Sequence, residues 1–371
     1  MSTPDLLPGH CFLPGPTEVH PDILQAQARP VISHRGPEMR ALMEGIQPGL
    51  RDVFRTGRPV MVSTSSATGL MEGAVRCGVR RKLLCLVNGA FSQRFADIAR
   101  LCGTPHEILE VPWGGVHDPG AVADRMAAGG FDAVSLVHSE TSTGALNDVP
   151  ALVRAVRQFP DVLVLVDSVT GIGGAPFHTD AWDVDLVLTG SQKALALPPG
   201  LAFGVASERF LERARSIPGR GMYLDVVDFY TQLAASQTPS TPAVTLMYAL
   251  EAQLRRISRE GMEARWARHA EMSRRTCSWV EQTARRMAAD LQVLAPQGGR
   301  SPTVTCVRLP PGVDGPRVVA GMRDRGWVIG GGYGKLKPHT VRIGHMGDHT
   351  VESLEALLAD LEHTLVQEVG S

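Results

Sequence analysis

One lysine in this sequence stands where amine chemistry is expected. Lys193 follows the apolar run 184–188 and lies between Gly190-Ser-Gln and Ala-Leu-Ala-Leu-Pro-Pro-Gly. Small and apolar neighbours desolvate an amine, which lowers its pKa and makes it nucleophilic, as Schiff-base chemistry requires. Taken alone, a loop lysine more often lies on the surface. Lys193 is therefore a candidate nucleophile whose assignment depends on a partner.

An acid ends a second apolar run. Asp167 follows the run 162–166, and a buried carboxylate is costly unless it has a partner. A protonated ring nitrogen is such a partner, because the neighbouring carboxylate favours the charged ring. Taken alone, Asp167 suits equally well a cap for the next turn. Its place on a strand next to that of Lys193 favours a shared site at the carboxyl ends of the strands, where open α/β sheets bind ligands.

Small hydroxyl residues follow an earlier strand. The segment Thr64-Ser-Ser-Ala-Thr-Gly69 precedes a predicted helix, whose free N–H groups and dipole attract an anion. Simple capping by Ser or Thr is the alternative, and this segment taken alone favours capping over phosphate binding. It lacks the GxxxxGK of a Walker loop. The run Gly171-Ile-Gly-Gly-Ala-Pro176 does not complete a dinucleotide fingerprint, because Pro176 replaces the last glycine and no helix starts there.

The elements that carry these residues alternate between short apolar runs and amphipathic stretches. Between about residues 58 and 206 we expect strands at 59–63, 82–87, 108–111, 133–137, 162–166, 184–188 and 201–206, with helices such as 70–76, 92–101 and 151–158. Several runs are apolar throughout, as in strands covered on both faces. The pattern predicts an α/β fold with a mostly parallel sheet and helices on both sides.

The character of the chain changes after residue 242. A long helical stretch covers about 244–289 with a break near Gly261, followed by strands at 303–309, 327–329 and 340–343 and helices at 316–325 and 351–366. We interpret this part as a smaller α+β domain. The expected division is an N-terminal segment 1–20, a large domain 21–250 and a small C-terminal domain 251–371.

Composition excludes several classes of protein. The 371 residues carry a net charge of −1 with both signs mixed, unlike a nucleic-acid binder. Six cysteines show no CxxC pair and no metal-like spacing, so we expect no metal site and reduced thiols, with Cys85 and Cys306 buried in strands. No secretory signal or membrane-length apolar run is evident. The protein is expected to be soluble and cytoplasmic.

Together these segments resemble the class V aminotransferases, which are fold type I pyridoxal-phosphate enzymes, and within them the alanine–glyoxylate and serine–pyruvate group. The resemblance covers almost the whole chain, from Leu13-Pro-Gly-Pro-Thr17 to the terminal helix. Its most specific motifs are Gly190-Ser-Gln-Lys-Ala194, Glu140-Thr-Ser-Thr-Gly144, Val166-Asp-Ser168 and Arg342-Ile-Gly-His-Met-Gly347.

The resemblance implies a role for each motif. Lys193 would carry the cofactor covalently and move the substrate α-proton, and Asp167 would keep the pyridine nitrogen protonated. Arg342 would bind the substrate carboxylate bidentately, and Tyr223 would border the substrate pocket. Further residues would bind the cofactor: Ser66, Ala67, Thr68 and Gln192 its phosphate, Thr141 its phenolic oxygen, and Phe91 and Val169 the two ring faces.

The same resemblance implies a ping-pong transaminase that uses a small amino acid (alanine, serine or glycine) and a 2-oxo acid (glyoxylate or pyruvate). It also implies a homodimer with shared active sites, because the loop at 238–242 would reach the partner's cofactor phosphate through Thr238 or Thr241. The aromatic residue that the family often has near Gln237 is missing, so the residue that makes this contact stays open.

Other functions fit the sequence less well. A 2-aminoethylphosphonate–pyruvate transaminase is the main alternative, because a phosphonate would also bind Arg342. A cysteine desulfurase would have His in place of Gln192 and a mobile cysteine in place of the strand residue Cys306. A phosphoserine aminotransferase would need a further His/Arg set. A non-catalytic paralogue would have lost Lys193, Asp167 or Arg342, and the failed glycine pattern argues against a nicotinamide dehydrogenase.

Overall fold

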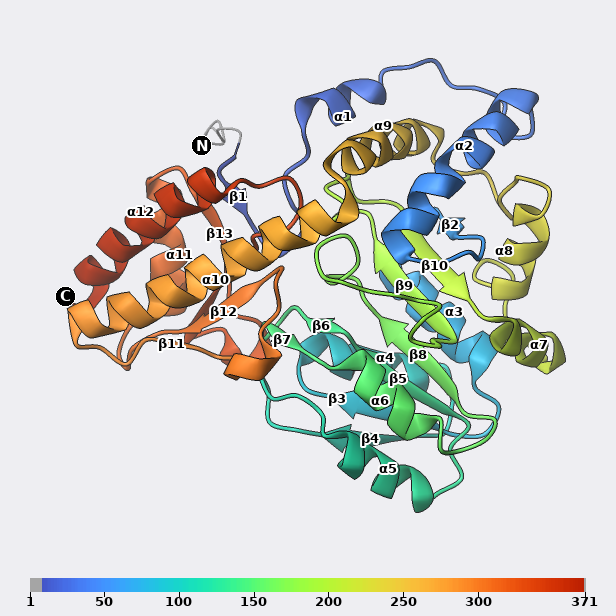
Figure 1. Ribbon diagram of the computed structural model, residues 1–371, viewed down its shortest axis with the longest axis horizontal. Helices are drawn as coiled ribbons and strands as arrows, with labels where there is room; N and C mark the ends of the chain where they lie inside the picture. Colours follow the sequence, from blue (N-terminus) through green and yellow to red (C-terminus); the bar gives the residue numbers. More distant parts are fainter. Residues whose placement is uncertain (1–8, 370–371) are drawn as a thin grey trace.

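Two large β-sheets organise the chain (Figure 1). The computed structural model describes residues 9–369. One sheet has seven strands and the other five, and a separate pair is formed by β6 (Ser139–Glu140) and β7 (Ala145–Leu146). The boundaries 1–20, 21–250 and 251–371 stay a prediction, and residues 1–8 of the first segment lie outside the described residues.

The seven-stranded sheet is mostly parallel, as predicted. Its order is β2-β10-β9-β8-β5-β3-β4, and only β10 runs antiparallel to its neighbours. The strands are β2 (Met61–Ser63), β3 (Leu83–Val87), β4 (His106–Glu110), β5 (Ala133–Val137), β8 (Leu163–Asp167), β9 (Leu186–Gly190) and β10 (Ala202–Ala206). Each matches a predicted run to within a few residues. The carboxyl ends of β2, β5, β8 and β9 therefore lie along one edge.

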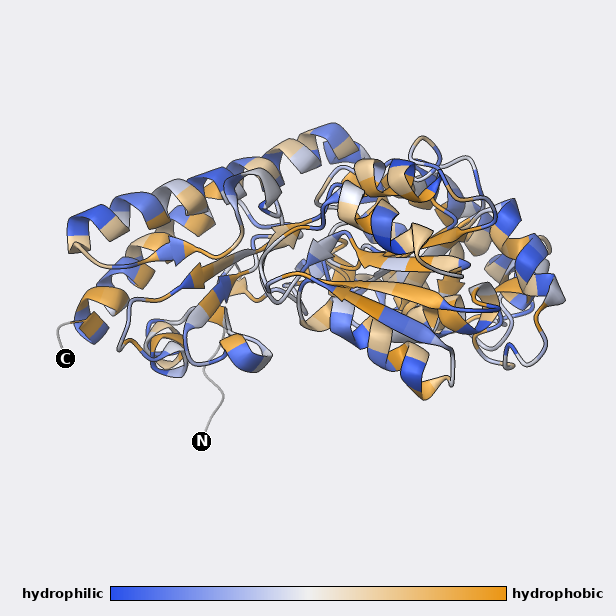
Figure 2. Cartoon of the chain, turned by 90° about the horizontal axis from the view of Figure 1, so that it is seen from below, coloured by the Kyte–Doolittle hydropathy of each residue, from blue (hydrophilic) through white to orange (hydrophobic). Residues whose placement is uncertain are grey.

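Both faces of this sheet are covered by helices, which explains why its strands are apolar throughout. Along β8, Val164 and Val166 pack into one hydrophobic cluster and Leu163 and Leu165 into another. The first cluster includes side chains of α2 (Pro37–Phe54), α5 (Pro119–Ala127), α6 (Val149–Val156) and α9 (Val244–Glu260); the second includes α3 (Ala67–Gly78), α4 (Ala90–Leu101), α7 (Glu208–Ser216) and α8 (Val226–Leu233). Figure 2 shows the hydrophobic strands lying between helices of mixed character.

The five-stranded sheet, called the small sheet below, packs against a second group of helices. Its order is β1-β13-β14-β12-β11, from β1 (Cys11–Phe12), β13 (Val328–Gly331), β14 (Thr340–Ile343), β12 (Thr305–Arg308) and β11 (Gln292–Val293). A third hydrophobic cluster joins it to α10 (Met262–Met287), α11 (Gly315–Asp324) and α12 (Val351–Val369). Because β1 pairs with β13, the N-terminal segment is tied to the C-terminal sheet.

The long helical stretch is broken where the sequence predicted. α9 ends at Glu260 and α10 begins at Met262, and Gly261 between them has φ +79°. Only glycine adopts this conformation without strain, so the residue separates two helices. The sequence interpretation did not name the helices before residue 58, α1 (Pro21–Ala26) and α2; α2 contains Pro48, a residue that disfavours helix interiors.

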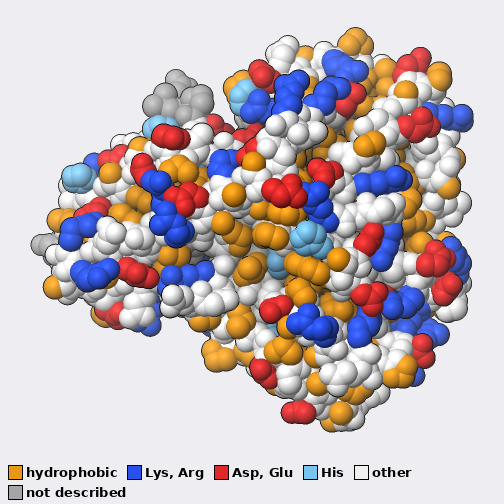
Figure 3. Space-filling view, viewed as in Figure 1, with side chains coloured by type: hydrophobic (Ala, Val, Ile, Leu, Met, Phe, Trp, Pro, Cys, Tyr) orange, Lys and Arg blue, Asp and Glu red, His pale blue; other side chains and the backbone are white. Residues whose placement is uncertain are grey.

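The surface agrees with the balanced charge of the sequence. In Figure 3, side chains of both signs are interspersed over the visible face rather than gathered by sign. Among the described residues, no helix is long and apolar enough to cross a membrane, and no cluster of three His, Cys, Asp or Glu side chains is arranged to hold a metal ion. Cys85 and Cys306 are fully buried, as expected, and all six cysteines are free thiols.

Candidate active site

Lys193 lies in a buried turn just after β9. Its side chain is 8% exposed, and its amino group donates a hydrogen bond to the carbonyl of Pro14. Burial is the main cause that lowers the pKa of Lys193 to about 8; the positive charges of Arg342 and Arg94 act in the same direction, and the negative charge of Asp167 acts against them. The amine therefore loses its proton more readily than an exposed lysine does, which favours its action as a nucleophile.

Asp167 is the last residue of β8, the strand beside β9. Its carboxyl group is buried, which raises its pKa to about 7. The N–H of Val169 donates to its Oδ1 at 2.8 Å, and this is the one hydrogen bond to the Asp167 carboxyl group among the described residues. The other oxygen is thus available to a cationic group such as a protonated ring nitrogen. The predicted pairing of Lys193 and Asp167 on neighbouring strands is present in the structure.

A buried histidine supports the turn after β8. Nδ1 of His138 is hydrogen-bonded to the Ser168 hydroxyl at 2.9 Å, and its ring contacts Phe177 and Trp182 edge-on. Burial lowers the pKa of His138 to about 3, so the imidazole is neutral. The sequence interpretation missed His138, because nothing in the local pattern distinguishes it from a core residue.

The start of α3 lies beside the turn that carries Lys193. A Cβ added to Gly190 would meet Oε1 of Gln192 at 2.7 Å and Cβ of Ala67 at 3.4 Å, so these two residues flank the same glycine. Ser66 is the N-cap residue of α3, and no side chain caps this helix. The N–H groups at Ala67 and Thr68 therefore remain open to an anion. The alternative for this segment, capping by a Ser or Thr side chain, is absent at the start of α3.

Glu140 joins the segments that carry Phe91 and Thr141. Its fully buried carboxylate accepts hydrogen bonds from the N–H groups of Phe91 (3.2 Å), Ser92 (2.8 Å) and Ser142 (3.1 Å) and from both serine hydroxyls (2.9 and 2.6 Å). It therefore fixes the start of α4 to the turn after β6. Glu140 belongs to the motif Glu140-Thr-Ser-Thr-Gly144, but the sequence analysis predicted no role for it. The pattern that could have indicated a role is a carboxylate followed by a run of hydroxyl residues.

One predicted ring-binding residue, Phe91, lies beside Lys193. Nζ of Lys193 lies 6.0 Å from the ring centroid of Phe91, which is half-buried at the start of α4. The hydroxyl of Thr141 is hydrogen-bonded to that of Thr170, and the side chain of Val169 is half-buried in the turn after β8. The predicted ring site is thus assembled from three separate strand ends.

Arg342 on β14 faces this group from the small sheet. Its Nε donates to the carbonyl of Gly331 at 2.8 Å and its Nη1 to the carbonyl of Thr141 at 3.2 Å. Its Cζ lies 5.5 Å from the ring centroid of Tyr333, and Arg342 forms no ion pair within the described residues. A buried guanidinium held by carbonyls alone retains donors for an anionic ligand. Gly331 belongs to the segment Gly330-Gly-Gly-Tyr-Gly334. This glycine-rich segment thus borders the site.

An N-terminal segment covers Lys193. Gly15 has φ +93°, and a Cβ at this position would overlap Cδ, Cε and Nζ of Lys193. The same segment runs past Gly344, where a Cβ would overlap the carbonyl of Leu13. These glycines allow the backbone to pass between Lys193 and the small sheet. The sequence analysis did not predict this role, although Gly15 lies in the segment Leu13-Pro-Gly-Pro-Thr17.

Three predicted site residues are not brought to Lys193 within the described chain. Thr238 and Thr241 lie against the segment 62–64 in a small crevice that Tyr223 also borders. The Tyr223 hydroxyl donates to the carbonyl of Thr64 at 2.9 Å, and this side chain is 51% exposed. These residues lie near the loop that leads to the start of α3. Their contacts with the cofactor or the substrate stay predictions.

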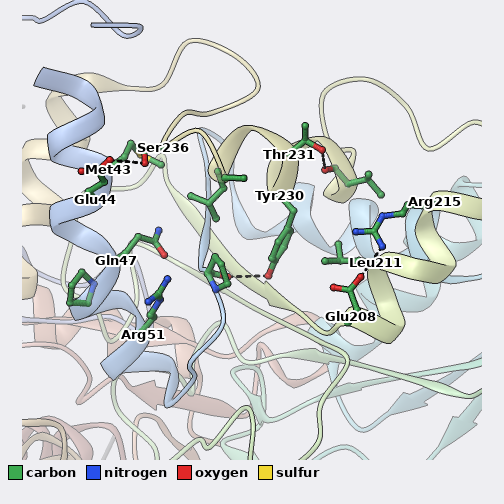
Figure 4. A pocket seen from close by; sticks show the side chains of 15 residues that line it. Met43, Glu44, Gln47, Arg51, Glu208, Leu211, Arg215, Tyr230, Thr231 and Ser236 are labelled. Atoms are coloured by element: carbon green, nitrogen blue, oxygen red, sulfur yellow. Dashed lines mark hydrogen bonds and ion pairs between the residues drawn. The ribbon is translucent and has the colours of Figure 1, made fainter. Parts of the chain in front are cut away.

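A pocket of about 630 Å³ lies elsewhere, between α2, α7 and α8 (Figure 4). Its polar groups are largely used within the pocket wall: Ser236 donates to Glu44, Arg215 to Glu208, and the Tyr230 hydroxyl to the carbonyl of Pro59. None of the predicted site residues lines it. The chemistry is therefore expected at the strand ends and not in this pocket.

A buried lysine and a buried acid at the ends of adjacent parallel strands, beside an open helix N-terminus, fit a pyridoxal-phosphate enzyme of fold type I. Residues 25–329 match the family model described as Aminotransferase class-V. The chain belongs to this family and is a pyridoxal-phosphate-dependent aminotransferase.

Characterised relatives extend over nearly the whole chain. It is 32% identical to the L-aspartate–glyoxylate aminotransferase of Paracoccus denitrificans, with 94% of this chain and 91% of the relative covered. It is 30% identical to the serine–glyoxylate aminotransferase of Arabidopsis thaliana, with 97% and 91% covered. The crystal structure of an alanine–glyoxylate aminotransferase from Nostoc sp. superposes with a TM-score of 0.89 at 31% identity, covering 98% of this chain and 97% of that one.

Proposed function

We propose that this protein transfers an amino group between a small amino acid (alanine, serine or glycine) and a 2-oxo acid (glyoxylate or pyruvate) by a ping-pong mechanism. The observation that carries the proposal is the arrangement of Lys193, Asp167 and Arg342. A desolvated amine, a buried carboxylate and a guanidinium without an ion pair converge on one space from β9, β8 and β14. The relatives that act on glyoxylate support the choice of acceptor.

The residues present fit the cofactor. The open N–H groups at the start of α3, with Ser66, Thr68 and Gln192, suit a phosphate. The free oxygen of Asp167 suits a protonated ring nitrogen, because a buried carboxylate is stabilised by a cation. Phe91 and Val169 would contact the two ring faces, and Thr141 would bond the phenolic oxygen. When bound, the protonated ring withdraws electrons from the substrate α-carbon.

The side chains of this protein then have separate tasks. Arg342 orients the substrate by its carboxylate. With the cofactor bound, the Lys193 amine would accept the α-proton of the substrate and return a proton to complete the transfer. The segment around Gly15 covers Lys193 and limits water around it. Repetition in reverse with the 2-oxo acid completes the cycle.

We also propose a homodimer with shared active sites, in which Thr238 or Thr241 reaches the partner's cofactor phosphate. The support is that this loop lies away from Lys193 of its own chain, against the segment 62–64. Sedimentation velocity of the purified protein tests the proposal, and a monomer at micromolar concentration would contradict it.

Absorption spectroscopy tests the transaminase cycle. The yellow band of the purified protein should bleach with L-alanine, L-serine or glycine and recover when glyoxylate or pyruvate is added. A protein that stays colourless with added pyridoxal phosphate would contradict the proposal. Bleaching by 2-aminoethylphosphonate and by none of these amino acids would transfer the function to a 2-aminoethylphosphonate–pyruvate transaminase.

A further inference from the structure

The rim of the site carries a second arginine. Arg94 lies one turn after Phe91 on α4, and its Cζ is 4.7 Å from the ring centroid of Phe91. Its Nη2 donates to the hydroxyl of Tyr333 at 3.3 Å. Arg94 thus faces the glycine-rich segment of the small sheet across the same space that Lys193 and Arg342 border.

Both arginines lie beside the Tyr333 ring. The Cζ of Arg342 is 5.5 Å from its centroid, and Arg94 meets its hydroxyl. Neither guanidinium forms an ion pair among residues 9–369, although the chain forms many arginine–carboxylate pairs elsewhere. Both arginines therefore keep donors for groups that are not part of the folded chain.

The charge balance of the site is positive. Lys193, Arg342 and Arg94 lie near one another, and each arginine opposes protonation of Lys193. Two acids lie nearby. Asp167 is expected to pair with the cofactor ring, and the Glu140 carboxylate already accepts hydrogen bonds from backbone N–H groups and a serine hydroxyl. A ligand with one carboxylate satisfies Arg342 and leaves Arg94 unpaired. A ligand with two carboxylates satisfies both.

We propose that Arg94 binds the distal carboxylate of a dicarboxylic substrate, so that the site takes acidic amino acids such as aspartate in addition to small neutral ones. This inference rests on the proposed function, because it places the ligand at the same site. Arg342 holds the α-carboxylate, and Arg94, half-buried at the rim, receives the carboxylate that points outward. Paired guanidinium–carboxylate contacts strengthen binding by about tenfold or more.

Binding of two matched, unreactive acids to the purified protein with its cofactor tests this inference directly. Succinate and butyrate have the same chain length and differ by one carboxylate, and neither carries an amine. Titration calorimetry should give a dissociation constant for succinate at least tenfold below that for butyrate. In Arg94→Gln, which keeps a donor to Tyr333 without the charge, the difference should shrink to threefold or less.

The control is Arg100→Gln, because Arg100 is exposed near the end of the same helix and should leave the succinate preference unchanged. Equal binding of succinate and butyrate by the wild-type protein would overturn the inference, as would an Arg94→Gln variant that weakens both acids equally. If Arg94→Gln fails to fold, Arg94→Lys serves, and a partial loss of the preference is expected because lysine lacks the planar fork.

The amino-donor reaction separates this inference from the proposed function. The ratio of kcat/KM for L-aspartate to that for L-alanine should fall at least tenfold in Arg94→Gln. A wild-type protein that bleaches with alanine but not with aspartate would contradict the dicarboxylate site and leave the transaminase standing. A protein that bleaches with no amino acid would contradict the proposed function, while the succinate titration would still report on Arg94.

Discussion

Glu140 accepts hydrogen bonds from both the backbone N–H and the hydroxyl of Ser92, at 2.8 and 2.9 Å. This relationship joins two strand ends, because Ser92 stands in the first turn of α4 and Glu140 ends β6. The carboxylate also reaches Ser142, so the position of Phe91 and that of Thr141 depend on one buried charge. Glu140 is thus a positioning residue for the predicted ring site.

Glu140→Gln should therefore weaken cofactor binding. The amide keeps the size of the side chain but loses the charge and one acceptor, and hydrogen bonds to charged groups contribute about 1.5–3 kcal/mol each. We expect the dissociation constant of pyridoxal phosphate to rise roughly tenfold to a hundredfold in a titration followed by absorbance. Glu110→Gln, the same change at an exposed position on β4, is the control. Equal affinities in wild type and Glu140→Gln would contradict this role.

Gly15→Ala should block Lys193. A Cβ at Gly15 overlaps the lysine side chain, whereas Gly312 has a similar φ of +89° with no atom within 4 Å of its added Cβ. Gly312→Ala therefore carries the backbone strain alone, about 1 kcal/mol of unfolding free energy. We expect Gly15→Ala to lose the yellow band and Gly312→Ala to keep it. The same spectrum in both variants would show that Gly15 does not constrain Lys193.

Asp167 should make the protein without cofactor less stable as the pH rises. Burial raises its pKa from 3.8 to about 7. The unfolded chain releases the proton at lower pH than the folded one, so stability is lost between about pH 4 and 7 and the cost is constant above. Asp167→Asn should then stabilise the cofactor-free protein at pH 8 by up to about 4 kcal/mol, but not at pH 4.

Urea unfolding of the cofactor-free wild type and Asp167→Asn at the two pH values measures this difference. Asp185→Asn is a contrasting variant, because Asp185 is also buried but is paired with Arg157 and Arg209. Loss of the Asp185 carboxylate leaves the two arginines without this partner, so Asp185→Asn should destabilise the protein at pH 8. A variant Asp167→Asn that is less stable than wild type at pH 8 would contradict the assigned pKa shift.

Arg342→Gln should impair substrate use while the cofactor stays bound. Loss of a guanidinium that binds a carboxylate in two places removes about 3 kcal/mol, so kcat/KM for alanine should fall about a hundredfold. The measurement is the rate at which the yellow band bleaches as a function of alanine concentration. Arg308→Gln on β12, whose half-exposed side chain pairs with Asp290, should behave as wild type. An unchanged kcat/KM in Arg342→Gln would remove this residue from the substrate site.

The strands, and the site residues that end them, were predictable because burial on both faces leaves an uninterrupted apolar run. Asp167 and Lys193 follow such runs, and adjacent parallel strands necessarily bring their ends together. The break at Gly261 was predictable for a local reason as well, since one glycine interrupts two helical patterns. Such signals lie within a few residues of the feature that they predict.

The contacts that refine the site join distant parts of the chain. Pro14 and Lys193 are separated by 179 residues, and Arg94 and Tyr333 by 239. Each partner looks ordinary in its own segment, because a proline in a loop or an arginine on a helix has no periodic signature. Their roles follow only from three-dimensional packing, and the same holds for Glu140.

We expect Lys193 to form the covalent bond to the cofactor. The chain has four lysines, and the other three are Lys82, which pairs with Glu107, and Lys335 and Lys337 in the segment before β14. Borohydride reduction of the yellow protein followed by peptide mass spectrometry locates the bond. We expect the phosphopyridoxyl group on the Lys193 peptide alone, and its absence from the Lys193→Arg variant. Label on any of the other three lysines, or a yellow protein without label on Lys193, would contradict it.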